Sequence, residues 1–132
     1  MTDSKIQIHK TPKGLTGLKV IYRHYKNNAR KRNLIFEFSV LEFSTITQHN
    51  CTYCGLVPSS VIAGHPKHYK SEETYINSAY IYNGLDRLDN AEGYTLTNCV
   101  PCCSICNHAK ATMSLSEFLN WIERLTNFRR SK

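Results

Sequence analysis

The stretch from Gly84 to Lys110, GLDRLDNAEGYTLTNCVPCCSICNHAK, decides the fold. Aromatic and aliphatic residues over 79–88 predict a strand, and residues 89–93 have the composition of a turn. We expect a second strand over 94–97 and a helix that begins near Cys103. This order of strand, turn, strand and helix gathers acids, amides and thiols in one short segment, which favours a metal site.

Two pairs of cysteines have the spacing of zinc knuckles: Cys51-x-x-Cys54, which Gly55 follows, and Cys103-x-x-Cys106. Together they supply four thiolates, the ligand set of a tetrahedral structural zinc site. Such a site has no open position, so the metal would hold the fold together rather than take part in a reaction. Six cysteines without an export signal also favour metal ligands and core thiols over disulfides.

A second register is available, because Cys99-x-x-Cys102 has the same spacing. We prefer Cys103 and Cys106, since the polar residue Asn107 follows them directly at the predicted helix start. Cys99 and Cys102 are then expected to be small core residues.

His65 and His68 lie in a loop-like segment and combine with Cys99 and Cys102 into a conceivable second zinc site. Spacing alone supports this site weakly. We expect the two histidines to be loop residues or substrate contacts.

Asp86 on the first strand and Asn107 on the helix supply oxygen ligands of the kind that Mg²⁺ or Mn²⁺ prefers. Asn98 is placed to orient neighbouring groups across the hairpin. Lys110, one helical turn after Asn107, is expected to meet a phosphate oxygen. Phosphodiester cleavage suits such a site, because a bound cation stabilises charge on the scissile phosphate and the leaving oxygen.

The net charge of +7 is concentrated at one end, since residues 1–33 carry nine basic side chains and one acidic side chain. Residues 15–33 predict an amphipathic helix with an apolar face made of Leu15, Leu18, Tyr22, Tyr25 and Ala29. The opposite face is basic, which indicates contact with the phosphates of a nucleic acid, through Lys19, Arg23, Lys26, Arg30, Lys31 and Arg32.

We expect a flexible basic leader over 1–14 and a single domain over 15–132. Residues 34–38 indicate a short strand or an extended link, and residues 56–78 a loop. Two capping boxes, Ser39 with Glu42 and Ser114 with Glu117, predict the starts of two further helices. The second helix is expected to run from 115 to about 127, with Trp121 in the core and an inward face made of Leu115, Phe118, Leu119, Ile122 and Leu125.

The composition is that of a globular protein, with 41% hydrophobic and 20% charged residues. No apolar run approaches the ~20 residues of a membrane span, and the N-terminus lacks the layout of a secretory signal. We therefore expect a cytoplasmic protein that is not secreted and has no membrane partner, in the host cytoplasm if a phage encodes it.

The motifs Asp86-Arg87, Gly93-Tyr94, Asn98 and Cys103-x-x-Cys106-Asn107-x-x-Lys110 resemble those of the HNH, or ββα-metal (His-Me finger), endonucleases of phages and mobile elements. The resemblance covers Cys51 to about Met113, and extends loosely to the basic helix and to residues 36–43. It implies an α+β fold, with a ββα-metal core over 79–113, a structural zinc held by four cysteines, and flanking helices.

The resemblance also assigns roles to residues. It implies that Asp86 and Asn107 bind the catalytic Mg²⁺ or Mn²⁺, that Asn98 is the middle Asn of the motif, and that the structural Zn²⁺ is bound by Cys51, Cys54, Cys103 and Cys106. Double-stranded DNA is the implied substrate, and a homodimer is a possible assembly.

The chain departs from the family at one position. Most members place His directly after the metal-binding Asp, as the general base, whereas this chain has Arg87. Arg stays protonated and can only contact or polarise a phosphate. The pattern Asp-Arg-x-Asp-x-x-x-Gly-Tyr is similar to that of PacI-like restriction enzymes, in which a Tyr is thought to start cleavage; Tyr94 matches it. His108 is the second candidate base, and a core role is the alternative for Tyr94.

Two functions follow from these patterns. The first is a metal-dependent DNA endonuclease or nickase in which Arg87 and Tyr94 replace the usual His. The second is a zinc-stabilised nucleic-acid-binding module without cleavage activity, which the missing His favours. A structural phage protein would fit the charge but would leave Asp86 and Asn107 unexplained.

Overall fold

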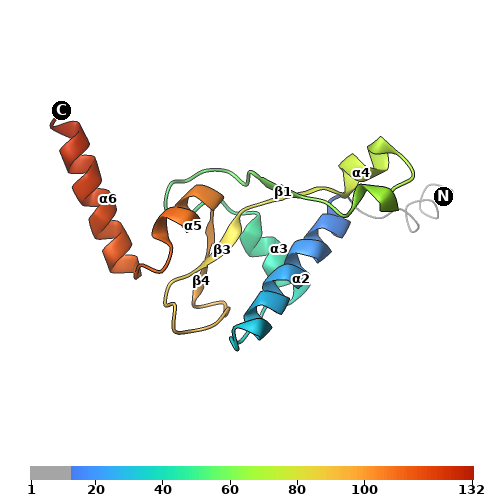
Figure 1. Ribbon diagram of the computed structural model, residues 1–132, viewed down its shortest axis with the longest axis horizontal. Helices are drawn as coiled ribbons and strands as arrows, with labels where there is room; N and C mark the ends of the chain where they lie inside the picture. Colours follow the sequence, from blue (N-terminus) through green and yellow to red (C-terminus); the bar gives the residue numbers. More distant parts are fainter. Residues whose placement is uncertain (1–12) are drawn as a thin grey trace.

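The computed structural model describes residues 13–132, so that most of the expected leader over 1–14 lies outside the described residues. Helices and two small sheets make up the fold, which confirms the α+β class. Figure 1 shows the order of the elements along the chain. They are α2 (Leu15–Lys31), α3 (Val40–Thr47), β1 (Ser60–Ile62), the 3₁₀ turn η1 (Pro66–His68), α4 (Glu72–Ser78), β2 (Tyr80–Tyr82), β3 (Gly84–Arg87), β4 (Cys99–Cys102), α5 (Ser104–Lys110) and α6 (Leu115–Arg130).

The central hairpin pairs β3 with β4 in antiparallel register, with Asp86 opposite Val100 and Arg87 opposite Cys99. The prediction of a second strand over 94–97 was wrong. Tyr94 forms only an isolated bridge with Phe36, and the following residues turn because the Asn98 N–H donates to the carbonyl of Thr95. The second strand of the hairpin, β4, therefore begins only at Cys99, and the helix α5 follows with Cys103 as its N-cap.

Asn83 divides the strand predicted over 79–88 into two strands that join different sheets. Its side chain is fully buried, and Nδ2 donates to the carbonyls of His49 and Leu56. These two carbonyls lie on either side of the first cysteine knuckle. Asn83 thus fixes the knuckle beside the start of β3.

The segment over 56–78 is not a loop, contrary to the prediction. It contains β1, which pairs with β2, as well as η1 and α4. Ser71 caps α4, since its Oγ accepts a hydrogen bond from the Thr74 N–H. The Pro and Gly residues of the segment mark the ends of these short elements, which are too brief to give a clear periodic signal.

Helix α2 packs against α3, α4 and the β1–β2 sheet. On the apolar face that the pattern predicted, Ala29 is buried and Tyr22 and Tyr25 are half-buried. Ile21, which the pattern did not include, is also buried there. Gly17 lies against the sheet so closely that a Cβ would come within 2.3 Å of the Ile62 carbonyl oxygen. The close approach explains why the sequence has no side chain at this point.

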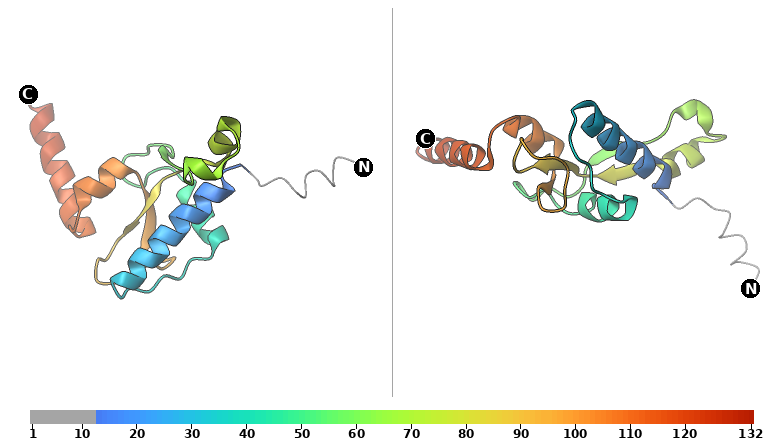
Figure 2. Two further views of the ribbon diagram at one scale, coloured as in Figure 1. Left: turned by 45° about the vertical axis from the view of Figure 1, so that its right-hand side comes forward. Right: turned by 90° about the horizontal axis from the view of Figure 1, so that it is seen from below.

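Both predicted capping boxes are present, at Ser39 with Glu42 and at Ser114 with Glu117. Helix α6 extends past the expected end and projects from one end of the molecule, opposite to α4 (Figures 1 and 2). Its predicted inward face is only partly correct. Phe118 is buried and Leu115 and Ile122 are half-buried, but Leu119 and Leu125 are exposed.

Candidate functional site

The four predicted zinc ligands form one cluster. The Sγ atoms of Cys51, Cys54, Cys103 and Cys106 all lie within 4.8 Å of one another. Tetrahedral zinc with bonds of ~2.3 Å separates its sulfurs by about 3.8 Å, and the Sγ atoms of Cys54 and Cys103 are 3.7 Å apart. The donor set and its spacing therefore fit a metal such as zinc.

Local backbone geometry builds both knuckles. Gly55 adopts a left-handed conformation, with a φ of 77°, and its N–H donates to the Cys51 carbonyl, which closes the first turn. Cys103 accepts a hydrogen bond from the Cys106 N–H on its Sγ, as the N-cap of α5. Burial alone would raise the pKa of the Cys51 thiol, but hydrogen bonds from neighbouring backbone N–H groups lower it to about 6. Burial, and then hydrogen bonding with Cys103, raise the pKa of the Cys106 thiol, so metal binding would have to displace protons from part of the cluster.

The alternative register is not supported. Cys99 and Cys102 are buried, as expected of core residues, and burial raises the pKa of Cys99 to about 12. Within residues 13–132, the four-cysteine cluster is the only group of three or more potential ligands of this kind, so His65 and His68 do not assemble with Cys99 and Cys102. The two histidine rings instead contact each other, with centroids 5.8 Å apart.

A second feature is a polar cleft of about 250 Å³ beside the hairpin. Asp86 and Arg87 reach it from β3, and Asn107 from α5. The Asn107 amide lies against the strand, with Nδ2 3.4 Å from the Leu85 carbonyl oxygen. The other side chains at its wall are Tyr25, Arg32, Leu85, Asn90, Tyr94, Ala111 and Thr112. The predicted metal ligands Asp86 and Asn107 therefore line the same cavity.

Both carboxylate oxygens of Asp86 have partners. The Tyr53 hydroxyl donates to Oδ2 at 2.5 Å, and Lys110 Nζ lies 3.3 Å from Oδ1. Asp86 is 4% exposed and Lys110 is fully buried, so this is a buried ion pair. Lys110 also donates to the Arg87 carbonyl. This arrangement corrects the expectation that Lys110 contacts a substrate phosphate. The ammonium group of Lys110 faces the interior, because Asp86 and the Arg87 carbonyl bind it there.

Arg87 and Tyr94 contact each other in the cleft wall. The guanidinium carbon lies 5.4 Å from the centre of the Tyr94 ring, and Nη1 donates to the carbonyls of Asn90 and Glu92. The Tyr94 ring also packs against Tyr25 and Phe36, in the hydrophobic core. Tyr94 is therefore a core residue, as the alternative expectation had it, and it also lines the cleft. Its role in cleavage stays a prediction.

Asn98 makes the cross-hairpin hydrogen bonds that its position predicted. Its Oδ1 accepts from the Asp89 N–H, and its Nδ2 donates to the carbonyls of Asp89 and Gly93. These bonds hold the turn that carries Asn90 and leads to Tyr94. Asn98 is buried and does not line the cleft, so it acts on the cleft through the backbone.

His108 lies outside the Asp86 cleft. It lines a neighbouring hollow with Ser104 and Tyr82, and Asn107 is part of both walls. Its Nδ1 is 2.7 Å from the Ser104 carbonyl oxygen, so Nδ1 carries the proton and donates it, which leaves Nε2 as the basic nitrogen. A role as a base would require substrate to cover both hollows.

The basic residues predicted to bind DNA lie on the exposed face of α2 and just beyond its end. Lys19, Arg23, Lys26, Arg30, Lys31 and Arg32 are all exposed. Arg32 also lines the polar cleft, which connects the basic face with Asp86 and Asn107. Their binding role stays a prediction.

Sequence reasoning missed Tyr53. This residue lies between Cys51 and Cys54 of the four-cysteine cluster, and its ring meets Phe118 of α6 edge-on, with centroids 5.1 Å apart. Burial, and then the hydrogen bond to Asp86, raise the pKa of its hydroxyl. The knuckle spacing is the one signal that could have indicated it, because a side chain between two zinc ligands is held in a fixed direction.

Comparison with known proteins supports the fold. The chain matches a solved structure of the rare-cutting HNH restriction endonuclease PacI with a TM-score of 0.55 and 24% identity, over 83% of this chain and 77% of that one. The chain has an HNH-endonuclease-like fold. No family model matches the sequence.

A curated relative gives no functional information by its name. Over 107 residues the chain is 30% identical to uncharacterized protein R423 of Acanthamoeba polyphaga mimivirus, a match that covers 81% of this chain. The matched segment is 16% of that viral protein, so the chain spans about a sixth of its relative's length. Among the helices of residues 13–132, none is long and apolar enough to cross a membrane.

Proposed function

We propose that the chain is a metal-dependent DNA endonuclease or nickase. The observation that carries the proposal is the cleft in which an acid from β3, an amide from α5 and a guanidinium group meet, at Asp86, Asn107 and Arg87. An HNH-like fold supports the same reaction class. The cysteine cluster lies at the N-terminus of α5, where a bound metal such as zinc would hold the helix that carries Asn107.

Each residue of the cleft would have a separate role in cleavage. Asp86 and Asn107 would bind Mg²⁺ or Mn²⁺, which when bound would stabilise charge on the scissile phosphate and the leaving oxygen. Arg87 would contact a phosphate oxygen through the guanidinium nitrogens other than Nη1, since Nη1 donates to two carbonyls that hold the group at the cleft wall. Tyr53 and Lys110 would orient the Asp86 carboxylate from behind.

A cleavage assay tests the proposal. Supercoiled plasmid incubated with the protein and Mg²⁺ or Mn²⁺ should be nicked, and Asn107→Ala should abolish nicking while the protein stays folded. Asn120→Ala is the matched control, because Asn120 is an exposed asparagine on α6 that lies outside the cleft. Loss of activity in the control, or nicking by Asn107→Ala at the wild-type rate, would contradict the assignment.

Cleavage also needs a group that accepts the proton of the attacking molecule or attacks the phosphate itself. We propose Tyr94 for this role, with His108 as the other candidate, and expect Tyr94→Phe to lower the cleavage rate by at least about a hundredfold. DNA binding should survive, since the change removes a single hydroxyl group. A Tyr94→Phe rate close to that of the wild type would transfer the role to His108, and His108→Ala should then lower the rate instead.

A second function has one specific observation in its favour. Lys110 already neutralises Asp86, and Arg87 stands where a general base is expected, which would suit a nucleic-acid-binding module without cleavage. The same plasmid assay separates the functions. Binding to DNA without nicking under either cation would favour the binding module.

A further inference from the structure

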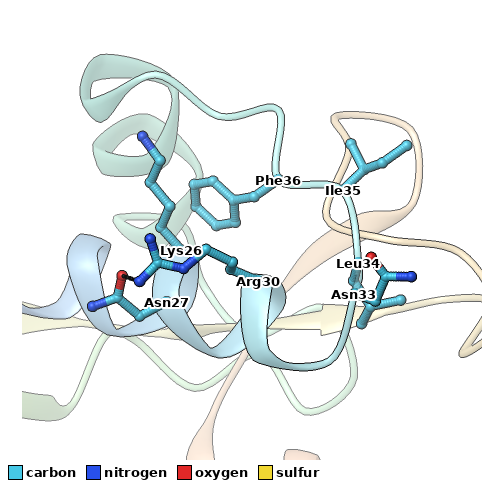
Figure 3. Close-up of a pocket in the computed structure, with 7 residues that line it drawn as sticks. All are labelled: Lys26, Asn27, Arg30, Asn33, Leu34, Ile35 and Phe36. Atoms are coloured by element: carbon cyan, nitrogen blue, oxygen red, sulfur yellow. Dashed lines mark hydrogen bonds between the residues drawn. The ribbon is translucent and has the colours of Figure 1, made fainter.

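A cavity of about 380 Å³ lies outside the polar cleft, between the last turns of α2 and the segment that follows it (Figure 3). Its walls combine basic, amide and apolar side chains: Lys26, Asn27, Arg30, Asn33, Leu34, Ile35 and Phe36. The volume falls in the range of pockets that hold small ligands, which begins at about 300 Å³.

A fixed helix cap shapes this pocket. Asn33 adopts the left-handed conformation, with a φ of 55°. Its N–H donates to the Arg30 carbonyl, and the Leu34 N–H donates to the Ala29 carbonyl, which is the hydrogen-bond pattern of a Schellman motif. The motif turns the chain back along α2, so that residues 34–36 form a wall facing the helix. The pocket is therefore part of the folded framework.

The side chains of the pocket match the two halves of a nucleotide. Lys26 and Arg30 are exposed cations on successive turns of α2, suited to a phosphate. Phe36 reaches across from the opposite wall toward them (Figure 3). Its ring is half-buried against the rings of Tyr22 and Phe38, which fix its position, and the part that lines the pocket is available for stacking. The side-chain oxygen Oδ1 of Asn27 accepts a hydrogen bond from Arg30 Nη2, which holds the amide at the pocket.

The pocket and the polar cleft have no lining residue in common, but residues that line them contact each other. The Tyr94 N–H donates to the Ile35 carbonyl at 2.7 Å, and the Phe36 and Tyr94 rings contact each other with centroids 5.8 Å apart. Phe36 thus lines the pocket, while the Tyr94 ring beside it lines the cleft. Arg32, which lines the cleft, lies in the chain between Arg30 and Asn33 of the pocket.

We propose that this pocket binds a single unpaired nucleotide of the DNA strand, with its base stacked on Phe36 and its phosphate between Lys26 and Arg30. The proposal rests on the proposed function in that the ligand is DNA held at the neighbouring cleft. A base inside a duplex is stacked on both faces and cannot reach the ring. The pocket therefore selects DNA with an extrahelical base, whatever the cleft does to the backbone.

Binding measured without catalysis tests this selection. Fluorescence anisotropy in EDTA would compare a labelled DNA duplex carrying one bulged nucleotide with the same duplex fully paired. We expect the wild type to bind the bulged duplex about tenfold more tightly, as one base–aromatic stack allows. Phe36→Leu should reduce this preference to about one, and Phe36→Tyr should retain it, because Tyr keeps the aromatic face.

Two controls distinguish binding in the pocket from non-specific electrostatic attraction to DNA and from loss of folding. Lys19 is on the same helix but outside the pocket. Lys19→Ala should therefore weaken the binding of both duplexes equally and leave the ratio of the two affinities unchanged. The zinc content of Phe36→Leu reports whether the variant is folded, since Leu keeps most of the buried volume.

The outcomes are distinct from those of the cleavage assay. Equal binding of the two duplexes by the wild type, failure to bind either duplex, or an unchanged preference in folded Phe36→Leu would overturn the pocket proposal. Absence of nicking together with a bulge preference would overturn the nuclease function and leave the pocket standing.

Discussion

At the scale of residues, Asp86 has to serve two purposes. It lines the polar cleft, and it also forms the buried ion pair with Lys110. A buried charge that loses its partner is strongly destabilising, whereas replacement of a whole pair by apolar or neutral groups is often tolerated. Any variant at this position therefore changes both the cleft and the stability of the core.

We predict that Asp86→Asn lowers the free energy of unfolding by about 3–5 kcal/mol, because it leaves the Lys110 ammonium buried without a counter-ion. Asp86→Asn combined with Lys110→Met should recover most of that loss. Urea denaturation followed by circular dichroism measures both. A double variant no more stable than the single one would show that the Lys110 charge is not the source of the cost.

At the scale of elements, the cysteine knuckles join parts of the chain that are far apart in sequence. The first knuckle lies between α3 and β1, and the second spans the start of α5. The Thr52 N–H also donates to the carbonyl of Pro101 in β4, so backbone hydrogen bonding supports the same junction. Because Cys103 is the N-cap of α5, a metal bound with Cys103 and Cys106 as ligands would lie at the start of this helix.

We predict that Cys103→Ser abolishes stoichiometric zinc binding, while Cys102→Ala retains one zinc per chain. The two cysteines are adjacent and both buried, but only Cys103 belongs to the four-thiol cluster. Elemental analysis of the purified proteins measures the zinc. If Cys102→Ala lost the metal and Cys103→Ser kept it, the alternative register would be the correct one.

At the scale of the whole molecule, α6 stands apart from the other elements (Figure 2). Its one buried side chain is Phe118, which packs on Tyr53 and so on the knuckle that holds Asp86. Leu125 and Phe128, on the outer turns, are about half exposed. The stability of the fold should therefore depend on the first turns of α6 and little on the last.

We predict that a chain ending at Ile122 keeps its zinc and loses less than about 1 kcal/mol of unfolding free energy, since exposed positions contribute little. Phe118→Ala in the full chain should cost about 3–5 kcal/mol, as expected for a buried aromatic side chain. Thermal and urea denaturation compare the two. A truncated chain as unstable as Phe118→Ala would mean that the outer turns of α6 are covered in the folded protein.

Features that depend on neighbours in sequence were predicted well. The capping boxes at Ser39 and Ser114 were confirmed, because a cap satisfies its own backbone groups within four residues. The α5 start at Cys103 was also correct. The loop predicted over 56–78 was wrong, since β1 forms there only by pairing with β2, which a local pattern does not reveal.

The sequence by itself determined which chemical groups are present: four thiols at knuckle spacing, an acid on the first strand of a hairpin, an amide on the helix that follows, and a basic helix. Only the tertiary structure decided where these groups face. In the structure, Lys110 faces inward and pairs with Asp86, and the Tyr53 hydroxyl donates to the same carboxylate. The second strand lies at 99–102 and not at the predicted 94–97. The reason is physical: spacing and caps act through the local backbone, whereas burial and ion pairing depend on surfaces that distant segments bring together.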